Sequence, residues 1–212
     1  MMVSNAKTLS HSAIFGNMMH ILSVLMYTPK EGILNEKNLI DNLIEYAEDL
    51  EDDKLVSKVR NIKQFLNEES EEDIVADHAQ LMVGPFELSA PPYGSVYLEK
   101  NRKIMGDTTM EVGQFYFDCG LEVASDYNDP PDHIAVEMEF IHFLFSEIFN
   151  SLNEDKVEDA ENYKAKLRKF LKKYYLPFSE NFAEKIKDNA ETNVYKITGD
   201  AILHINKFLK EF

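Results

Sequence analysis

The sequence predicts an all-α fold: a single globular multi-helix domain over residues 1–212, with about nine helices. The first observation behind this prediction is that apolar residues recur at helical spacing along nearly the whole chain. The second is that 212 residues include only 8 glycines and 7 prolines, too few for a many-turned β fold. The third is composition, because a chain of this length with 44% hydrophobic residues can bury a sizeable core.

Four helices are expected in the first third of the chain, each recognised by an apolar stripe and by a start or stop signal. Asn35 and Ser70 are favourable N-cap residues, and Asp73 completes a weak capping box with Ser70. The turn at residues 28–32, which contains Pro and Gly, ends the first helix. The first expected helix begins near Ser10 or Ser12, and the second follows Asn35. The third covers about 55–66, and the fourth runs from Ser70 to about Leu81.

Residues 84–98 interrupt the helical pattern. Their sequence, Gly-Pro-Phe-Glu-Leu-Ser-Ala-Pro-Pro-Tyr-Gly-Ser-Val-Tyr-Leu, contains three prolines, which disfavour helix at themselves and at the residues before them. We therefore expect the whole segment to be non-helical. Its Phe, Tyr and Leu residues argue against disorder, and long ordered loops in compact domains usually carry function. The sequence thus predicts a long, ordered, proline-rich loop.

Five more helices are expected in the remaining half. Gly120 should end the first of these helices, and Pro177 should separate the fourth helix from the third. At the start of the central one, Asp129 is expected to cap, and Pro130 to occupy the first helical position. The expected ranges are about 108–119, 129–149, 155–174, 178–189 and 191–211.

The segment 132–149 is apolar on nearly every side of a helical wheel, which indicates a buried central helix. Nevertheless His133 and Glu137, one turn apart, lie on one of its apolar stripes. An unpaired buried carboxylate is costly, so Glu137 needs a partner. If the partner is His133 or a backbone amide, Glu137 only stabilises the fold. If the partner is a ligand, Glu137 belongs to a binding site. The sequence leaves both possibilities open.

Several classes of function are disfavoured. A net charge of −16 disfavours nucleic acid as a partner, because phosphate binding requires Lys and Arg. A single cysteine, Cys119, allows no intrachain disulfide and no cysteine-based zinc site. No secretion signal is evident, and no apolar stretch approaches the roughly 18 residues of a membrane span. We expect a cytoplasmic protein without stable membrane insertion.

A metal site is the chemical alternative that the sequence leaves open. Glu139 and His142 have the Glu-x-x-His spacing of carboxylate di-iron bundles, but no second copy of that motif is present. His133 and Glu137 would supply two further ligands of a helical metalloenzyme. Because one short motif without its context is weak, we predict no catalytic residue, no metal and no cofactor.

Two segments resemble motifs of the TorD/DmsD family of assembly chaperones. Residues 78–85 and 90–98, ending in Pro-Pro-Tyr-Gly-Ser-Val-Tyr-Leu, resemble its Leu-Phe-x-Gly-Pro and Pro-Pro-Tyr-Glu-Ser-Val-Tyr segments. Residues 130–140, Pro-Pro-Asp-His-Ile-Ala-Val-Glu-Met-Glu-Phe, resemble its Pro-Asp-His-x-x-x-Glu-Leu-Glu-Phe segment. The order and spacing agree. One departure is Gly94, which stands where the family carries a glutamate.

The resemblance implies an all-helical chaperone of anaerobic respiration that is not an enzyme. It would bind the twin-arginine leader peptide and the apoenzyme of a molybdopterin-dependent reductase until cofactor insertion and export. It would act as a monomer or as a domain-swapped homodimer. The alternative within the related NarJ branch is a scaffold for a reductase subunit that is not exported.

The peptide site is expected between the 84–98 loop and the start of the 130–149 helix. Carboxylates there would accept charge-assisted hydrogen bonds from the leader's arginines, and aromatic side chains would pack on its apolar stretch. An acidic surface would attract the basic leader. The expected peptide-binding residues are Leu81, Phe86, Pro92, Tyr93, Tyr97, Asp132, His133 and Glu137.

Overall fold

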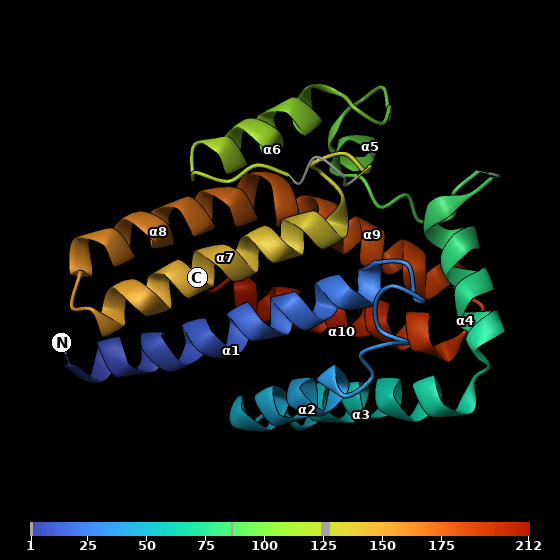
Figure 1. Ribbon diagram of the computed structural model, residues 1–212, viewed down its shortest axis with the longest axis horizontal. Coiled ribbons are helices and arrows are strands. Elements are labelled where there is room, and N and C mark those ends of the chain that lie inside the picture. Colours follow the sequence, from blue (N-terminus) through green and yellow to red (C-terminus); the bar gives the residue numbers. More distant parts are fainter. Residues whose placement is uncertain (1, 86, 124–127) are drawn as a thin grey trace.

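The computed structural model describes residues 2–85, 87–123 and 128–212. The regular secondary structure of these residues is helical, with no β-strand (Figure 1). The all-α prediction is confirmed. The helices of the first half are α1 (Met2–Met26), α2 (Leu39–Asp49), α3 (Asp53–Glu68), α4 (Glu71–His78), the π-helical turn η1 (Ala79–Val83) and α5 (Gly94–Leu98). Those of the second half are α6 (Asp107–Phe117), α7 (Ile134–Asn153), α8 (Val157–Phe170), the π-helical turn η2 (Leu171–Tyr175), α9 (Leu176–Asn189) and α10 (Asn193–Leu209).

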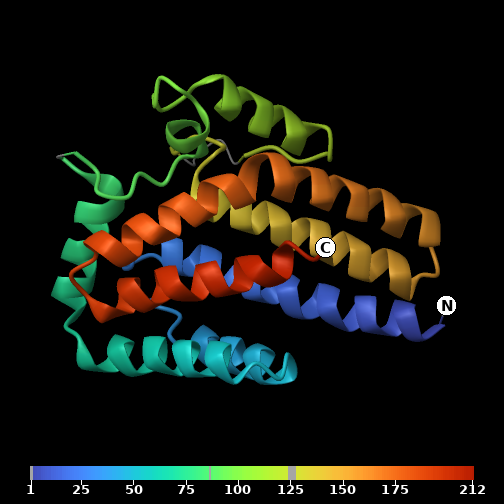
Figure 2. The same cartoon turned by 180° about the vertical axis from the view of Figure 1, so that it is seen from behind.

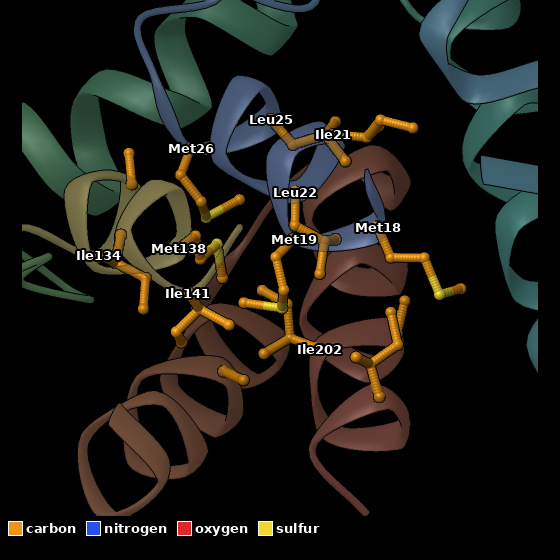
Figure 3. Close-up of a cluster of buried hydrophobic side chains, with 14 of the residues drawn as sticks. Met18, Met19, Ile21, Leu22, Leu25, Met26, Ile134, Met138, Ile141 and Ile202 are labelled. Atoms are coloured by element: carbon orange, nitrogen blue, oxygen red, sulfur yellow. The ribbon is translucent and has the colours of Figure 1, made fainter. Parts of the chain in front are cut away.

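The core lies where α1 and α7 pack side by side, with α10 against α1 (Figure 3). Methionine, leucine and isoleucine side chains from the three helices pack against one another there, as expected of a protein interior. The labelled members are Met18, Met19, Ile21, Leu22, Leu25, Met26, Ile134, Met138, Ile141 and Ile202, all at most 2% exposed. The central position predicted for the 132–149 helix is therefore confirmed.

The other helices cover this core. Seen from behind, α10 lies between α9 and α3, and the α2–α3 pair closes the lower side (Figure 2). On the side of the core opposite the α2–α3 pair, α8 packs along α7, and α6 forms an outer layer above them (Figure 1). Within the described ranges, no helix is long and apolar enough to cross a membrane.

Each of the nine expected helices has a counterpart, and two local signals act as predicted. The Ser70 side chain accepts a hydrogen bond from the Asp73 amide at the start of α4. Gly120 adopts a left-handed φ of 81° just after α6, a conformation that glycine tolerates best. Side-chain caps and left-handed stops are local devices, so the sequence reveals them directly.

Several boundaries differ from expectation. α7 was expected over 129–149 with Pro130 at its first position, but it begins at Ile134 and Pro130 lies before it. α1 begins at Met2 rather than near Ser10, because no proline or glycine interrupts the helix in between. α2 begins at Leu39, because Asn35 lies in a turn in which its amide bonds to the Gly32 carbonyl at 3.0 Å. Pro177 does not break the chain: it lies in the first turn of α9, directly after the π-turn η2. Proline's missing N–H is tolerated in a first turn.

Candidate peptide-binding site

The two family-like segments meet in space. The Gly94 amide donates to the Asp132 carbonyl at 2.8 Å, and the Ile134 amide donates to the Pro92 carbonyl at 2.8 Å. Between them Tyr93 and His133 form an antiparallel β-bridge. We call this contact of residues 92–94 with residues 132–134 the 93/133 crossing.

The crossing determines how two helices begin. Asp132 Oδ2 accepts from the Ser95 amide at 2.7 Å, so Asp132 caps α5 rather than the helix of its own segment. His133 Nδ1 accepts from the Ala135 amide at 3.2 Å, so His133 is the N-cap of α7. Asp129, expected to cap that helix, instead accepts a hydrogen bond from the Tyr93 hydroxyl at 2.8 Å.

The short helix α5 corrects the expectation that residues 84–98 are entirely non-helical. Its five residues follow the last proline of the segment, so no proline opposes them. Its first turn is stabilised by the Asp132 carboxylate, which lies far away in the sequence. A cap supplied by tertiary structure leaves no local pattern, which explains why the sequence did not reveal α5. The part of the loop that precedes it, among described residues, is not helical.

Two carboxyl groups are buried beside the crossing. Asp132 and Glu137 are both 0% exposed, and a Cβ at Gly94 would lie 3.2 Å from Glu137 Oε1. Asp132 Oδ1 and both Glu137 oxygens have no hydrogen-bond partner among the described residues. Burial raises the pKa of Glu137 well above its usual range, and the charge of Asp132 raises it further. Burial therefore favours the protonated, neutral form of the Glu137 side chain, which lowers the cost of burying it.

His133 is buried in the same place, where its neutral form is also favoured. It is 7% exposed, and its desolvation lowers its pKa to about 4. The Tyr93 ring meets it edge-on, with centroids 5.6 Å apart, and the Tyr27 ring stacks parallel to it at 6.4 Å. His133 thus connects the proline-rich segment to the end of α1.

An open groove of about 350 Å³ lies next to the crossing. Two of its lining residues contact the crossing segments: Tyr27 stacks on His133, and the Tyr116 hydroxyl donates to the Pro131 carbonyl at 2.9 Å. Most of the lining is apolar, and its two carboxylates, Glu122 and Glu139, belong to exposed residues. The groove is lined by Tyr27, Tyr116, Leu121, Glu122, Val123, Val136, Glu139 and Phe140.

Most of the expected peptide-binding residues gather at the crossing, and none of those that the structure describes lines the groove. Pro92, Tyr93, Asp132, His133 and Glu137 lie at the crossing itself. The neighbouring Tyr97 packs on Phe178, with ring centroids 5.2 Å apart.

Two expected residues remain. Leu81 is buried in η1, where its carbonyl accepts from the Ala90 amide at 2.9 Å. Phe86 lies outside the described residues. Glu122 and Tyr27 line the groove but are not among the expected residues, and Glu139 was expected only as a possible metal ligand. The signal for Glu139 was available, since it lies two residues after a buried position and therefore on another side of the helix.

The residues of the metal alternative do not form a metal site. Glu139 points to the groove, whereas His142 Nδ1 lies 2.9 Å from the Gly16 carbonyl oxygen. In the part of the chain that the structure describes, no group of three or more His, Cys, Asp or Glu residues could hold a metal ion.

Comparison with known proteins identifies the family. The family described as nitrate reductase delta subunit matches residues 48–184. The probable Tat proofreading chaperone DmsD of Haemophilus influenzae is 23% identical over 189 residues, which are 89% of this chain and 85% of that protein. The chaperone protein TorD of Aliivibrio fischeri is 24% identical over 155 residues, which are 72% of this chain and 69% of that protein.

The fold has a counterpart among solved structures. A putative redox enzyme maturation protein from Archaeoglobus fulgidus superposes with a TM-score of 0.53 at 19% identity, covering 92% of this chain and 93% of that one. At this identity the likeness supports the fold alone. Because the family match covers more than half of the chain, we conclude that the chain belongs to the nitrate reductase delta subunit family and is, like its TorD and DmsD relatives, an assembly chaperone and not an enzyme.

Proposed function

We propose that this protein is a cytoplasmic maturation chaperone that binds the twin-arginine leader and the apo form of a molybdopterin-dependent reductase until cofactor insertion and export. Relatives named as Tat proofreading chaperones support the general role. The observation that carries the proposal is the groove next to the 93/133 crossing, where apolar side chains and two exposed carboxylates line one open surface.

The groove matches the chemistry of such a leader, which combines two arginines with an apolar stretch. Glu122 and Glu139 would each accept a bidentate hydrogen bond from a guanidinium group. The apolar stretch would pack on Val136 and Phe140, as in other grooves that take a peptide helix or strand. The net charge of −16 would speed the arrival of a basic peptide.

The residues at the crossing take a supporting role in this proposal. Asp132 and Glu137 are fully buried, so the leader cannot reach them unless the crossing opens. Asp132 and His133 cap α5 and α7, and His133 supports Tyr27, which lines the groove. Direct contact of the leader with Tyr93 or Tyr97, both half-buried, remains part of the proposal.

We expect the variant Glu122→Gln/Glu139→Gln to bind the leader at least about tenfold more weakly, because each substitution removes a charged acceptor at constant size. Calorimetric titration with twin-arginine leader peptides would measure the affinity. A Lys-Lys version of the peptide should also bind more weakly, since lysine cannot form the bidentate fork.

The matched control is Glu36→Gln/Glu45→Gln, which removes two exposed glutamates outside the groove. It should leave the affinity within about twofold, because distant exposed charges are screened by salt. Equal losses in the two variants would remove the groove from the site. Binding of a mature apoenzyme but of no leader would favour the scaffold role of the NarJ branch.

A further inference from the structure

A basic loop precedes α6. Residues 100–105, Lys-Asn-Arg-Lys-Ile-Met, are all exposed, and two of them are non-glycine residues in the left-handed region, Arg102 with φ 50° and Met105 with φ 63°. Lys100, Arg102 and Lys103 make no ion pair with any described residue. The loop thus presents three exposed cations without such a pair on a chain whose net charge is −16.

The basic loop has the chemical character that the groove is proposed to bind. Arg102 and Lys103 are two adjacent cations, and the apolar Ile104 and Met105 follow them directly. Ile104 is 48% exposed and Met105 is 73% exposed, so both side chains are available to a partner.

An exposed apolar strip connects the basic loop to the groove. α6 is part of the outer layer of the molecule (Figures 1 and 2). Met110 is 74% exposed and Phe117 is 62% exposed, and their spacing of seven residues places them on the same face of this helix. The basic loop lies before the N-terminal end of α6, whereas Tyr116, Leu121 and Glu122 of the groove lie at its C-terminal end. Clustered exposed apolar residues of this kind commonly mark an interaction surface.

The charges along this strip are arranged for self-pairing. Lys100, Arg102 and Lys103 lie at one end, and the exposed Asp118 and Glu122 lie at the other, near Glu139. If a second copy packs antiparallel along α6, each positive end meets a negative end, and Met110 and Phe117 are covered between them. A two-fold arrangement uses the same patch on both subunits, so both contacts form at once.

We propose that two copies of this chain pair antiparallel along α6, with the basic loop of each inserted in the groove of the other, and that the leader must displace this loop. The pairing itself is argued from the surface. Its regulatory consequence rests on the proposed function, because only a groove that takes the leader would be blocked by the loop.

Sedimentation equilibrium of the full chain at low salt tests the pairing. Arg102→Glu/Lys103→Glu should raise the dimer dissociation constant at least about tenfold, because like charges then face each other. Glu122→Lys/Glu139→Lys should do the same. An equimolar mixture of these two variants should form mixed dimers. In such a dimer the acidic loop of one variant meets the basic groove of the other, and the second contact is the native one. Met110→Ser/Phe117→Ser should weaken pairing without touching either charged end.

The matched control is Lys54→Glu/Lys207→Glu, which makes the same charge change at exposed lysines on α3 and α10 and should leave the dimer intact. Circular dichroism would show that each variant is folded. A wild-type chain that stays monomeric at all concentrations, or a mixture that fails to dimerise, would overturn the proposal.

Leader titration separates the two proposals. Under both of them, Arg102→Glu/Lys103→Glu should bind the leader more tightly than wild type, because its own loop no longer competes. If that monomeric variant binds no leader, the proposed function fails while the pairing stands. If this variant binds the leader with the affinity of wild type, and the leader does not dissociate the wild-type dimer, the loop does not compete with the leader. The proposed insertion of the loop in the groove is then wrong.

Discussion

Replacing Glu137 with glutamine is expected to raise the free energy of unfolding by an amount that grows as pH rises above the unfolded pKa of the carboxyl group, with a slope of at most about 1.4 kcal/mol per pH unit. Burial raises the pKa of Glu137 in the folded protein, so the native state keeps a proton that the unfolded state releases. A group of this kind stabilises the fold fully below its unfolded pKa, and the stabilisation is lost as pH rises toward the folded pKa. Glutamine, which does not titrate, removes this loss.

His133 acts in the opposite direction. Its pKa is lowered to about 4 in the fold, so the stability that it contributes is present above its unfolded value of 6.5 and is lost as pH falls toward about 4. Below pH 6.5, where the pH ranges of the two groups overlap, the two effects oppose each other. The difference between variant and wild type cancels the contribution of His133 and isolates that of Glu137.

Urea unfolding at pH 5, 6 and 7 would measure this difference, which should grow over the range. Glu139→Gln is the matched control, because the same substitution two residues along falls on an exposed side chain and should change the free energy of unfolding by no more than about 0.5 kcal/mol. A constant difference for Glu137→Gln would show that this carboxyl group titrates normally in the fold.

The second large effect is expected at Gly199, where α9 and α10 approach closely. A Cβ there would lie 2.7 Å from the Ala183 carbonyl oxygen and 3.3 Å from Ile186 Cγ2. Because a backbone oxygen cannot rotate away, Gly199→Ala must push the two helices apart, at a cost of about 1–3 kcal/mol. This cost exceeds the gain of about 1 kcal/mol that alanine brings to a helix interior.

Gly113→Ala in α6 is the matched control and should have the opposite sign. A Cβ there would lie 3.5 Å from Pro131 Cγ, an ordinary contact, so only the helix preference of alanine acts. We expect stabilisation by about 0.5–1 kcal/mol. Chemical unfolding of both variants would measure the two effects. Stabilisation by both substitutions would show that α9 and α10 can separate without cost.

Part of the site could be predicted from the sequence because its residues share local motifs. The segments around Tyr93 and His133 were expected to form one site, and the 93/133 crossing brings them together. The position of α7 in the core followed from its apolar pattern. The role of Asp132 could not be predicted, because the amide that it caps belongs to Ser95, in a distant segment.

The groove itself could not be read from the sequence. Its lining comes from the end of α1, the end of α6 with the residues that follow, and the first half of α7. No periodicity links Tyr27, Glu122 and Glu139, so only packing could show that they face one open surface. The same holds for the basic loop, whose importance depends on the lack of an ion pair between its cations and any described residue.

The sequence by itself determined the helical class, the central helix, the stop at Gly120 and the family, because these depend on periodicity, local caps and contiguous motifs. Only the tertiary structure decided that Glu137 is fully buried with a raised pKa, that α5 exists, and that Glu139 rather than Asp132 faces an open groove. The physical reason is that solvation and long-range hydrogen bonds belong to a position in space, and a one-dimensional pattern does not contain that position.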